Sequence, residues 1–576
     1  MQRGSGVTEG TKRAGFSSYA PIAAWLPDYE RSWLRADAIA AATVWALLVP
    51  EAMAYASLAG MPPETGLWTA PLALLGYAIF GTSKQLNVGP SSTVAVLSLS
   101  VVTPIAGGDP EVFIALTSWL AILLGVIFVI FGIFKAGFIA DFMSKPVLDG
   151  FIIGLALTIA AGQLHKLFGL DVDGSNFFQD IWYVVRDLGE TNWATFLVGA
   201  GSLAALFLID RFVPRLPGAL VVMFAAIFIV SISNLEERGV HIVGEIPGGL
   251  PPFGLPESVG FSNIVALIPG ALAILIVGFA ESVAAARSYA SKHGYEIDAS
   301  QEMIALGASN FGAGFSGGFV VDGSLSKTAA ADGAGQKTQM TSIIVAVLVL
   351  ITALWFTWLF ENLPEATLAA IVIHAVWHLI DFGKISRYLD IRKDDFWAGL
   401  VALLGVLAFG ILPGLALAVI LSLFFLVGRA SRPNTEILGE VASDEIGISV
   451  YRSIERFPDA RQVPGLLIYR FDAQLFFANA PVFEKQLMTA LRAAVPAVEV
   501  VLVDAETISD IDSTALVMLA ELEHKLSADG ISIWYARLRG EPLEVVERAD
   551  TFAHLEDPTL YPTIGAGVEA FESGAR

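Results

Sequence analysis

The segments Asn87-Val-Gly-Pro-Ser-Ser-Thr93 and Gly317-Gly-Phe-Val-Val-Asp-Gly-Ser-Leu-Ser-Lys327 decide how this chain folds. Each interrupts an apolar stretch with glycine or proline, which predicts a short extended piece followed by a half-helix. Pro90 lies near the first turn of the first half-helix, and Ser91 and Ser324 are the expected N-caps. Such irregular backbone survives inside a membrane only where it lines a cavity or is covered by protein.

The regions around these segments have the composition of a membrane protein. Hydrophobic residues make up 55% of the 576 residues, charged residues only 16%, and the mean hydropathy is +0.66. Apolar runs such as Ile343–Phe360 and Phe396–Val427 are long enough to cross a hydrocarbon core of ~30 Å. We predict an α-helical polytopic membrane protein with fourteen spans, two of them short, at residues 38–57, 66–80, 91–106, 112–133, 146–165, 192–209, 217–232, 263–286, 300–313, 324–331, 339–360, 364–380, 396–410 and 412–428.

The two broken segments lie seven spans apart, which predicts a seven-plus-seven inverted repeat with the binding site between the two breaks. Both half-helices would then direct their N-termini at one point. Free N–H groups and the helix dipoles attract an anion there. The sequence therefore predicts a transporter of small anions rather than an enzyme.

Charge in the connections predicts the orientation. Lys and Arg gather in the even-numbered connections, as at Lys84, Arg211, Lys292 and Arg387, whereas the odd-numbered ones are mostly acidic. The positive-inside rule then places both termini in the cytoplasm of a multi-pass protein of the cell (inner) membrane. The start of the chain has no apolar stretch or cleavage site of a signal peptide, so we expect residues 1–35 to form a cytoplasmic segment.

The composition changes after the transmembrane transport domain, which we place at residues 36–430. From Ser431 onward there are 12 basic and 24 acidic residues, a net charge of −12. Apolar runs shorten to strand length and alternate with amphipathic stretches, which predicts a soluble α/β domain over residues 431–576. Its expected strands include 465–469 and 498–503, and its expected helices include 481–493 and 513–528.

Several function classes are excluded. The net charge of −22 argues against nucleic acid as a partner, and the absence of cysteine excludes disulfides and thiol chemistry. Gly312–Gly317 fits GxGxxG without a βαβ unit around it, and Ser324–Lys327 fits SxxK without its companion motifs. His374 and His378 are four residues apart but have no obvious third ligand, so no metal and no cofactor is expected.

Three charged residues inside apolar spans are candidates for function. Glu281 lies six residues before Arg287, about 9 Å of helix inside the hydrocarbon zone, and is a candidate for proton coupling. Lys327 lies in the first turn of the second half-helix, where a cation is unfavourable unless an anion or Glu281 lies opposite. Glu51 is a second buried carboxylate, either a proton site or a structural partner.

Together these residues resemble the SulP (sulfate permease) family of anion transporters over nearly the whole chain. The matching segments are Val49–Leu67, Gly76–Lys84, Val88–Pro90, Phe279–Ser282, Ala305–Asn310 and Gly323–Thr328. The C-terminal part resembles a STAS domain, with Val503–Ala505 and Ile511–Leu516 at the expected strand-turn-helix.

The resemblance implies a core of spans 1–4 and 8–11 that moves against a gate of spans 5–7 and 12–14, in a homodimer. By position it assigns Tyr55, Ser92 and Ser326 to the substrate site, and Lys327 stands where the family usually has Arg. Lysine would hold an oxyanion as a point charge rather than through a bidentate fork. With Ser91 and Glu51, these residues form the expected anion site.

Glu51 stands where many family members have Gln, and Glu281 matches the carboxylate of proton-coupled members. Because two ionised glutamates would repel a dianion, substrate entry should require protonation of at least one of them. We expect proton-coupled sulfate uptake by an elevator mechanism. Bicarbonate or C4-dicarboxylate symport, an uncoupled exchanger or channel, and a sensor with the STAS domain as its output are the alternatives. Ser513 is either a regulatory phosphorylation site or the N-cap of the helix that follows.

Overall fold

The computed structural model describes residues 20–141, 144–171, 174, 176–213, 216–441, 449–538, 540–548 and 560–574. Most of the expected N-terminal segment, residues 1–19, lies outside them. The chain divides into two compact units, Met1–Ser422 and Leu423–Arg576, which are described separately.

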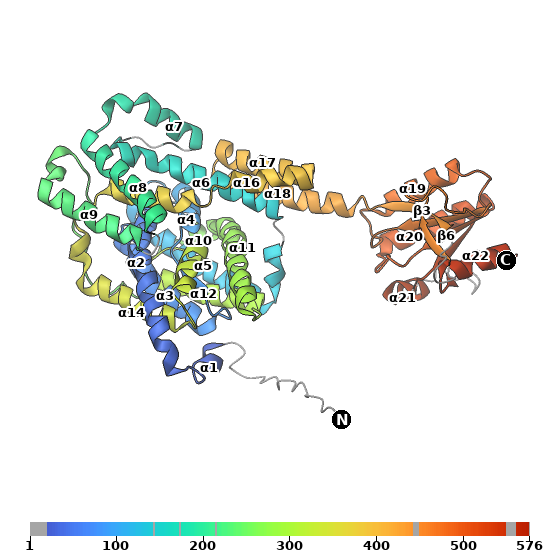
Figure 1. Ribbon diagram of the computed structural model, residues 1–576, viewed down its shortest axis with the longest axis horizontal. Helices are drawn as coiled ribbons and strands as arrows, with labels where there is room; N and C mark the ends of the chain where they lie inside the picture. Colours follow the sequence, from blue (N-terminus) through green and yellow to red (C-terminus); the bar gives the residue numbers. More distant parts are fainter. Residues whose placement is uncertain are drawn as a thin grey trace. The chain divides into compact units, whose positions relative to one another are not determined.

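The first half of the membrane unit has a helix at each of its seven predicted spans (Figure 1). These helices are α2 (Leu34–Leu58), α3 (Glu64–Phe80), α4 (Ser92–Ala106), α5 (Pro110–Ile133), α6 (Lys145–Phe168), α8 (Trp193–Phe212) and α9 (Gly218–Ser233). Local signals set their ends. Asp109 caps α5 by accepting from the backbone N–H of Glu111 at 3.0 Å, and Pro110 occupies the first turn. Gly169, with φ of 68°, ends α6 in the left-handed conformation.

The second half repeats this pattern. Its helices are α10 with α11 (Phe261–Ala266 and Ile268–His293), α12 (Ala299–Phe315), α13 (Leu325–Gly333), α14 (Met340–Trp355), α15 (Glu365–Trp377), α17 (Lys393–Phe409) and α18 (Ile411–Ala430). The expected α-helical architecture of fourteen spans, with α4 and α13 as the half-helices, is therefore confirmed. In the described part of the chain, 7 helical stretches are long and apolar enough to cross a membrane by themselves.

Among the described residues of the membrane unit, two ten-residue helices were not predicted, α7 (Phe177–Arg186) and α16 (Phe382–Ile391). Both are shorter and more polar than a membrane span, so a search for long apolar runs passes over them. Shorter helical turns are α1 (Ile22–Trp25), η2 (Arg31–Trp33), η3 (Ala136–Asp141), η4 (Leu188–Glu190), η5 (Leu235–Arg238) and η6 (Thr357–Phe360).

The two halves are interleaved rather than side by side. Helix α12 packs against α3 and α5, and α14 packs against α2 and α3. Helices α15 and α17 pack against α6, and α15 also packs against α8. Glycines allow the closest of these contacts: a Cβ atom on Gly150 of α6 would lie 1.9 Å from the carbonyl oxygen of Gly399 of α17.

The C-terminal unit is a six-stranded sheet with helices on both faces. The strand order is β4-β3-β5-β6-β7-β8, with β3 antiparallel to its neighbours and the strands from β5 to β8 parallel. The strands are β3 (Thr435–Val441), β4 (Val450–Ser453), β5 (Leu466–Phe471), β6 (Val500–Asp504), β7 (Ser532–Ala536) and β8 (Leu560–Tyr561). The helices are α19 (Ala480–Ala493), α20 (Ser513–Ala528), α21 (Glu541–Arg548) and α22 (Ile564–Glu572).

Successive side chains along each strand point to opposite faces of the sheet, and this produces an apolar core on each face. Phe471 and Val503 pack with α19 and α20 residues such as Phe483 and Leu519. Residues of opposite parity, such as Leu502, pack with α22 on the other face. The βαβα pattern predicted from the sequence is confirmed.

Candidate functional site

The two broken segments meet in the membrane unit. Strand β1 (Asn87–Gly89) pairs antiparallel with β2 (Asp322–Ser324), with Asn87 opposite Ser324 and Gly89 opposite Asp322. Helices α4 and α13 begin where these strands end. This pairing satisfies the extended backbone inside the bundle, and it brings the N-termini of both half-helices to one place.

Lys327, in the first turn of α13, is the centre of the site. Its Nζ donates to Glu51 Oε2 at 3.0 Å and to the carbonyl oxygen of Pro90 at 2.9 Å. The same ammonium lies 5.4 Å from the centre of the Tyr55 ring, a cation–π distance. The Lys327 side chain is 3% exposed and that of Glu51 13%, so this is a nearly buried ion pair.

The sequence allowed Glu281 or an anion as the partner of Lys327, and of the two glutamates the structure assigns this ion pair to Glu51. Glu51 and Tyr55 are four residues apart on α2, so both side chains face the start of α13. Glu51 is therefore the acidic partner of Lys327 in this structure.

Glu281 lies instead beside Asp322, a residue that the sequence analysis did not single out. Asp322 is 2% exposed, and within the described residues neither of its carboxylate oxygens accepts a hydrogen bond of normal geometry. Strand β2 is held against α11, because the backbone N–H of Gly323 donates to Ser282 Oγ at 2.8 Å. The signal that could have identified Asp322 is an acidic residue within a broken apolar span.

Glu302 shows how a structural carboxylate of this unit is satisfied. It is 1% exposed and accepts from the Tyr77 hydroxyl at 2.6 Å, and also from the Thr82 hydroxyl, the Thr82 N–H and the Ser83 N–H. Buried carboxylates are normally hydrogen-bonded in this way. Both carboxylate oxygens of Asp322, by contrast, lack hydrogen-bond partners of normal geometry among the described residues, and Asp322 lies at the meeting point of the half-helices.

Of the two serines expected to cap the half-helices, only one makes a capping hydrogen bond through its side chain. Ser324 caps α13 as predicted, its Oγ accepting from the Lys327 N–H at 3.3 Å. Ser91 stands at the N-cap of α4 but makes no capping bond, and within the described residues its buried Oγ has no partner. Ser91 is therefore the N-cap residue, as predicted, but its hydroxyl lies near Asp322 and does not cap the helix. Ser92 is 8% exposed, in the first turn of α4.

Ser326 is exposed at the start of α13, with its Oγ 3.1 Å from that of Ser324. The structure thus brings Glu51, Tyr55, Ser91, Ser92, Ser326 and Lys327 together around the paired half-helices. The site also contains Asp322 and, beside it, Glu281.

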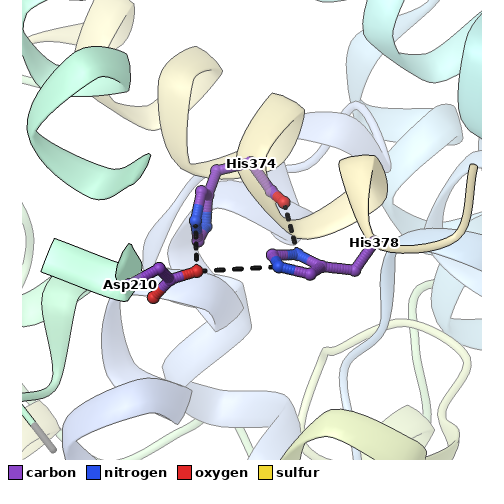
Figure 2. Close-up of side chains that lie close together, drawn as sticks. All are labelled: Asp210, His374 and His378. Carbon is purple, nitrogen blue, oxygen red and sulfur yellow. Dashed lines mark hydrogen bonds and ion pairs between the residues drawn. The ribbon is translucent and has the colours of Figure 1, made fainter. Parts of the chain in front are cut away.

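A second cluster lies at the C-terminal ends of α8 and α15 (Figure 2). His374 Nε2 lies 2.8 Å from Asp210 Oδ2, and His378 Nε2 lies 3.6 Å from the same oxygen. The histidine pair thus has an acidic neighbour that could act as a third ligand, which was not obvious from the sequence. The reason is that Asp210 is 164 residues from His374 in the sequence and reaches it only through the packing of α8 on α15.

Ser513 of the C-terminal unit is the first residue of α20, and it is exposed. The N-cap is Asp512, whose Oδ1 accepts from the Ala515 N–H at 2.8 Å and whose Oδ2 accepts from the Phe477 N–H at 2.8 Å. The assignment of the cap to Ser513 is wrong by one residue, because the carboxylate before it satisfies both the helix and the neighbouring loop.

Comparison with known proteins agrees with this architecture. The model of the Sulfate permease family matches residues 34–402, and that of the STAS domain matches residues 457–567. A "probable sulfate transporter" of Mycobacterium tuberculosis is 36% identical over 96% of this chain and 98% of its own length. "Sulfate transporter 3.1" of Arabidopsis thaliana is 29% identical over 96% of this chain and 87% of its own.

Two solved structures share the fold. The murine Solute Carrier 26 family member A9 anion transporter has a TM-score of 0.89 at 24% identity, covering 99% of this chain and 96% of its own. The transmembrane domain of a cyanobacterial bicarbonate transporter has a TM-score of 0.60 at 21% identity, covering 68% of this chain and 98% of its own.

Proposed function

This chain belongs to the sulfate permease family, and we propose that it carries sulfate across the cell membrane together with protons. The family consists of transporters and not of enzymes. The observation that carries the proposal is the ion pair between Lys327 and Glu51 at the meeting point of the half-helices. It offers an anion site that protonation can open.

The first step in this mechanism is protonation of Glu51. While Glu51 is ionised, it neutralises Lys327 at 3.0 Å and competes with any incoming anion. A proton on Glu51 removes that negative charge and leaves the buried ammonium without its ion-pair partner, an unfavourable state. Sulfate then supplies the missing charge, with N–H groups of α4 and α13 as further donors.

The second proton site is the carboxyl pair of Glu281 and Asp322. Two adjacent buried carboxyl groups repel each other when both are ionised, so they should hold at least one proton between them. Together with Glu51, Glu281 and Asp322 give the site three acidic groups and one basic group, Lys327. A dianion therefore needs accompanying protons to enter this site.

The packing supports movement of the site as one body. Its residues lie on α2, α4, α11 and α13, which belong with α3, α5, α12 and α14 to the expected core. We propose that this core slides against a gate of α6, α8, α9, α15, α17 and α18, as in an elevator, within a homodimer. Both termini and the STAS domain would then face the cytoplasm from the inner membrane.

The test is uptake by purified full-length protein in sealed liposomes. An inward proton gradient should drive radioactive sulfate above its external concentration, and a protonophore should abolish this accumulation. Stronger competition by bicarbonate or by a C4-dicarboxylate than by unlabelled sulfate would change the assigned substrate. Uptake that does not depend on the proton gradient and requires an anion inside the liposomes would identify an exchanger and contradict proton coupling.

A further inference from the structure

Asp210, His374 and His378 are not among the residues assigned to the anion site, although His374 interacts electrostatically with Glu51. The proposed transport mechanism does not use this cluster. Asp210 lies near the C-terminal end of α8, His374 lies in the last turn of α15, and His378 is the C-cap of α15. We propose that these three side chains bind a divalent transition-metal ion of the zinc class, which joins α8 to α15.

The arrangement of the ligand atoms supports the proposal. The three candidate atoms all lie within 4.8 Å of one another. Two histidines four residues apart present both rings on one helical face, and Figure 2 shows both rings directed at the Asp210 carboxylate. Ligands ~2.0–2.1 Å from a tetrahedral zinc ion are about 3.3 Å apart. The observed distances of 2.8 and 3.6 Å lie on either side of this value.

The tautomer of His378 leaves the correct nitrogen free for a metal. Its Nδ1 lies 3.2 Å from the carbonyl oxygen of His374. A carbonyl can only accept, so Nδ1 carries the proton and, in the neutral ring, Nε2 presents a lone pair to Asp210 Oδ2. A metal ion between these two atoms, 3.6 Å apart, would bind both of them. Metal-bound histidines commonly donate their second N–H to a carbonyl in this way.

Neighbouring rings hold His374 in place. The Phe207 ring packs edge-on against His374 with centroids 5.1 Å apart, and the His378 ring packs against it in the same way with centroids 5.2 Å apart.

The chemistry of the three ligands suits zinc. Zinc commonly binds imidazole and carboxylate groups, and a pair of neutral histidines with one carboxylate carries a single negative charge. Asp210, His374 and His378 would supply three ligands, which leaves the fourth position of a tetrahedral ion open to water.

Another histidine of the chain provides a matched comparison. His293 Nε2 lies 2.6 Å from Asp332 Oδ1, but Lys292 Nζ occupies the other carboxylate oxygen at 2.6 Å. This carboxylate is already neutralised by an ammonium, and Asp332 is not part of a candidate metal cluster in the described residues. A single His–Asp pair is therefore not enough for the proposed metal site, which also needs the second imidazole, that of His378.

The experiment uses full-length protein purified without a polyhistidine tag and stripped of metal by a chelator. Titration with Zn²⁺ against a chromophoric competitor should show one tight equivalent, and Co²⁺ at the same site should give the visible bands of a tetrahedral ion. His378→Ala, at an exposed side chain, should weaken Zn²⁺ binding at least tenfold and remove the Co²⁺ bands. His374→Ala should do the same, and His293→Ala should leave both unchanged.

A parallel thermal-unfolding measurement checks that the variants are folded. Zn²⁺ should raise the unfolding midpoint of wild type and of His293→Ala, and should not raise that of His378→Ala. Equal Zn²⁺ affinity in wild type and His378→Ala, or a loss that occurs only in His293→Ala, would overturn the proposal.

Discussion

Lys327 Nζ and Glu51 Oε2 lie 3.0 Å apart, although the two residues are separated by 276 positions in the chain. Their side chains come from different helices, α13 and α2, and both are largely buried. The helix dipole disfavours a positive charge at the N-terminus of a half-helix, and this cost suggests that the cation has a second use. We assign that use to the transported anion.

Removing the cation should remove anion binding. Lys327→Ala should weaken sulfate affinity by ~1.5–3 kcal/mol, the range for a charge-assisted hydrogen bond, measured by calorimetry at acidic pH. Lys327→Arg keeps the charge and should retain measurable binding. Wild-type affinity in Lys327→Ala would mean that the lysine is only a structural partner of Glu51.

The carboxyl pair should affect coupling more than binding. Glu281→Gln and Asp322→Asn each remove one titratable group at nearly constant shape, so both should bind sulfate but lose accumulation driven by a pH gradient. Glu302→Gln is the matched control: its four hydrogen bonds mark a structural role. That variant should lower thermal stability and leave coupling intact in the folded protein. Full uphill transport by both Glu281→Gln and Asp322→Asn would contradict this role.

Close packing of α3 on α2 should hold Glu51 in position. A Cβ atom on Gly66 of α3 would lie 2.0 Å from the carbonyl oxygen of Ala52, the residue after Glu51. Gly66→Ala should therefore displace α2, destabilise the protein by ~1–3 kcal/mol and reduce sulfate uptake. Gly201→Ala on α8, where a Cβ atom would meet nothing within 4 Å, should behave like wild type. Equal thermal stability of the two variants would refute the packing argument.

The cap of α20 should depend on Asp512 rather than on Ser513. Asp512→Ala should destabilise the helix start by ~0.5–2 kcal/mol, seen as faster hydrogen exchange of its first-turn amides in the full-length protein. Ser513→Ala should change exchange little, and Ser513→Asp should leave transport near wild type. A large loss of transport in folded Ser513→Asp would instead favour a regulatory switch at Ser513.

The features that could be predicted are those set by residues close together in the sequence. Glycine and proline within apolar runs located both half-helices, and hydropathy located all fourteen spans. The identity of the ion-pair partner was not predictable in the same way, because Glu51 reaches Lys327 only after β1 pairs with β2 and α13 packs on α2. Asp210 was missed for the same reason, and although Asp322 was recognisable as an acidic residue within a broken apolar span, its pairing with Glu281 was not. Their significance depends on what surrounds them, and that surrounding comes from distant segments.

The central claim is that Glu51 and the anion compete for Lys327, and the pH dependence of sulfate affinity tests it most directly. If sulfate binding requires a proton on Glu51, wild-type affinity should fall as the pH rises, by at most about tenfold per pH unit for each proton taken up. Calorimetry in buffers of different ionisation enthalpy should show protons taken up as sulfate binds. Glu51→Gln should bind sulfate with a much flatter pH dependence and take up fewer protons. An unchanged pH slope and proton uptake in Glu51→Gln would contradict the claim.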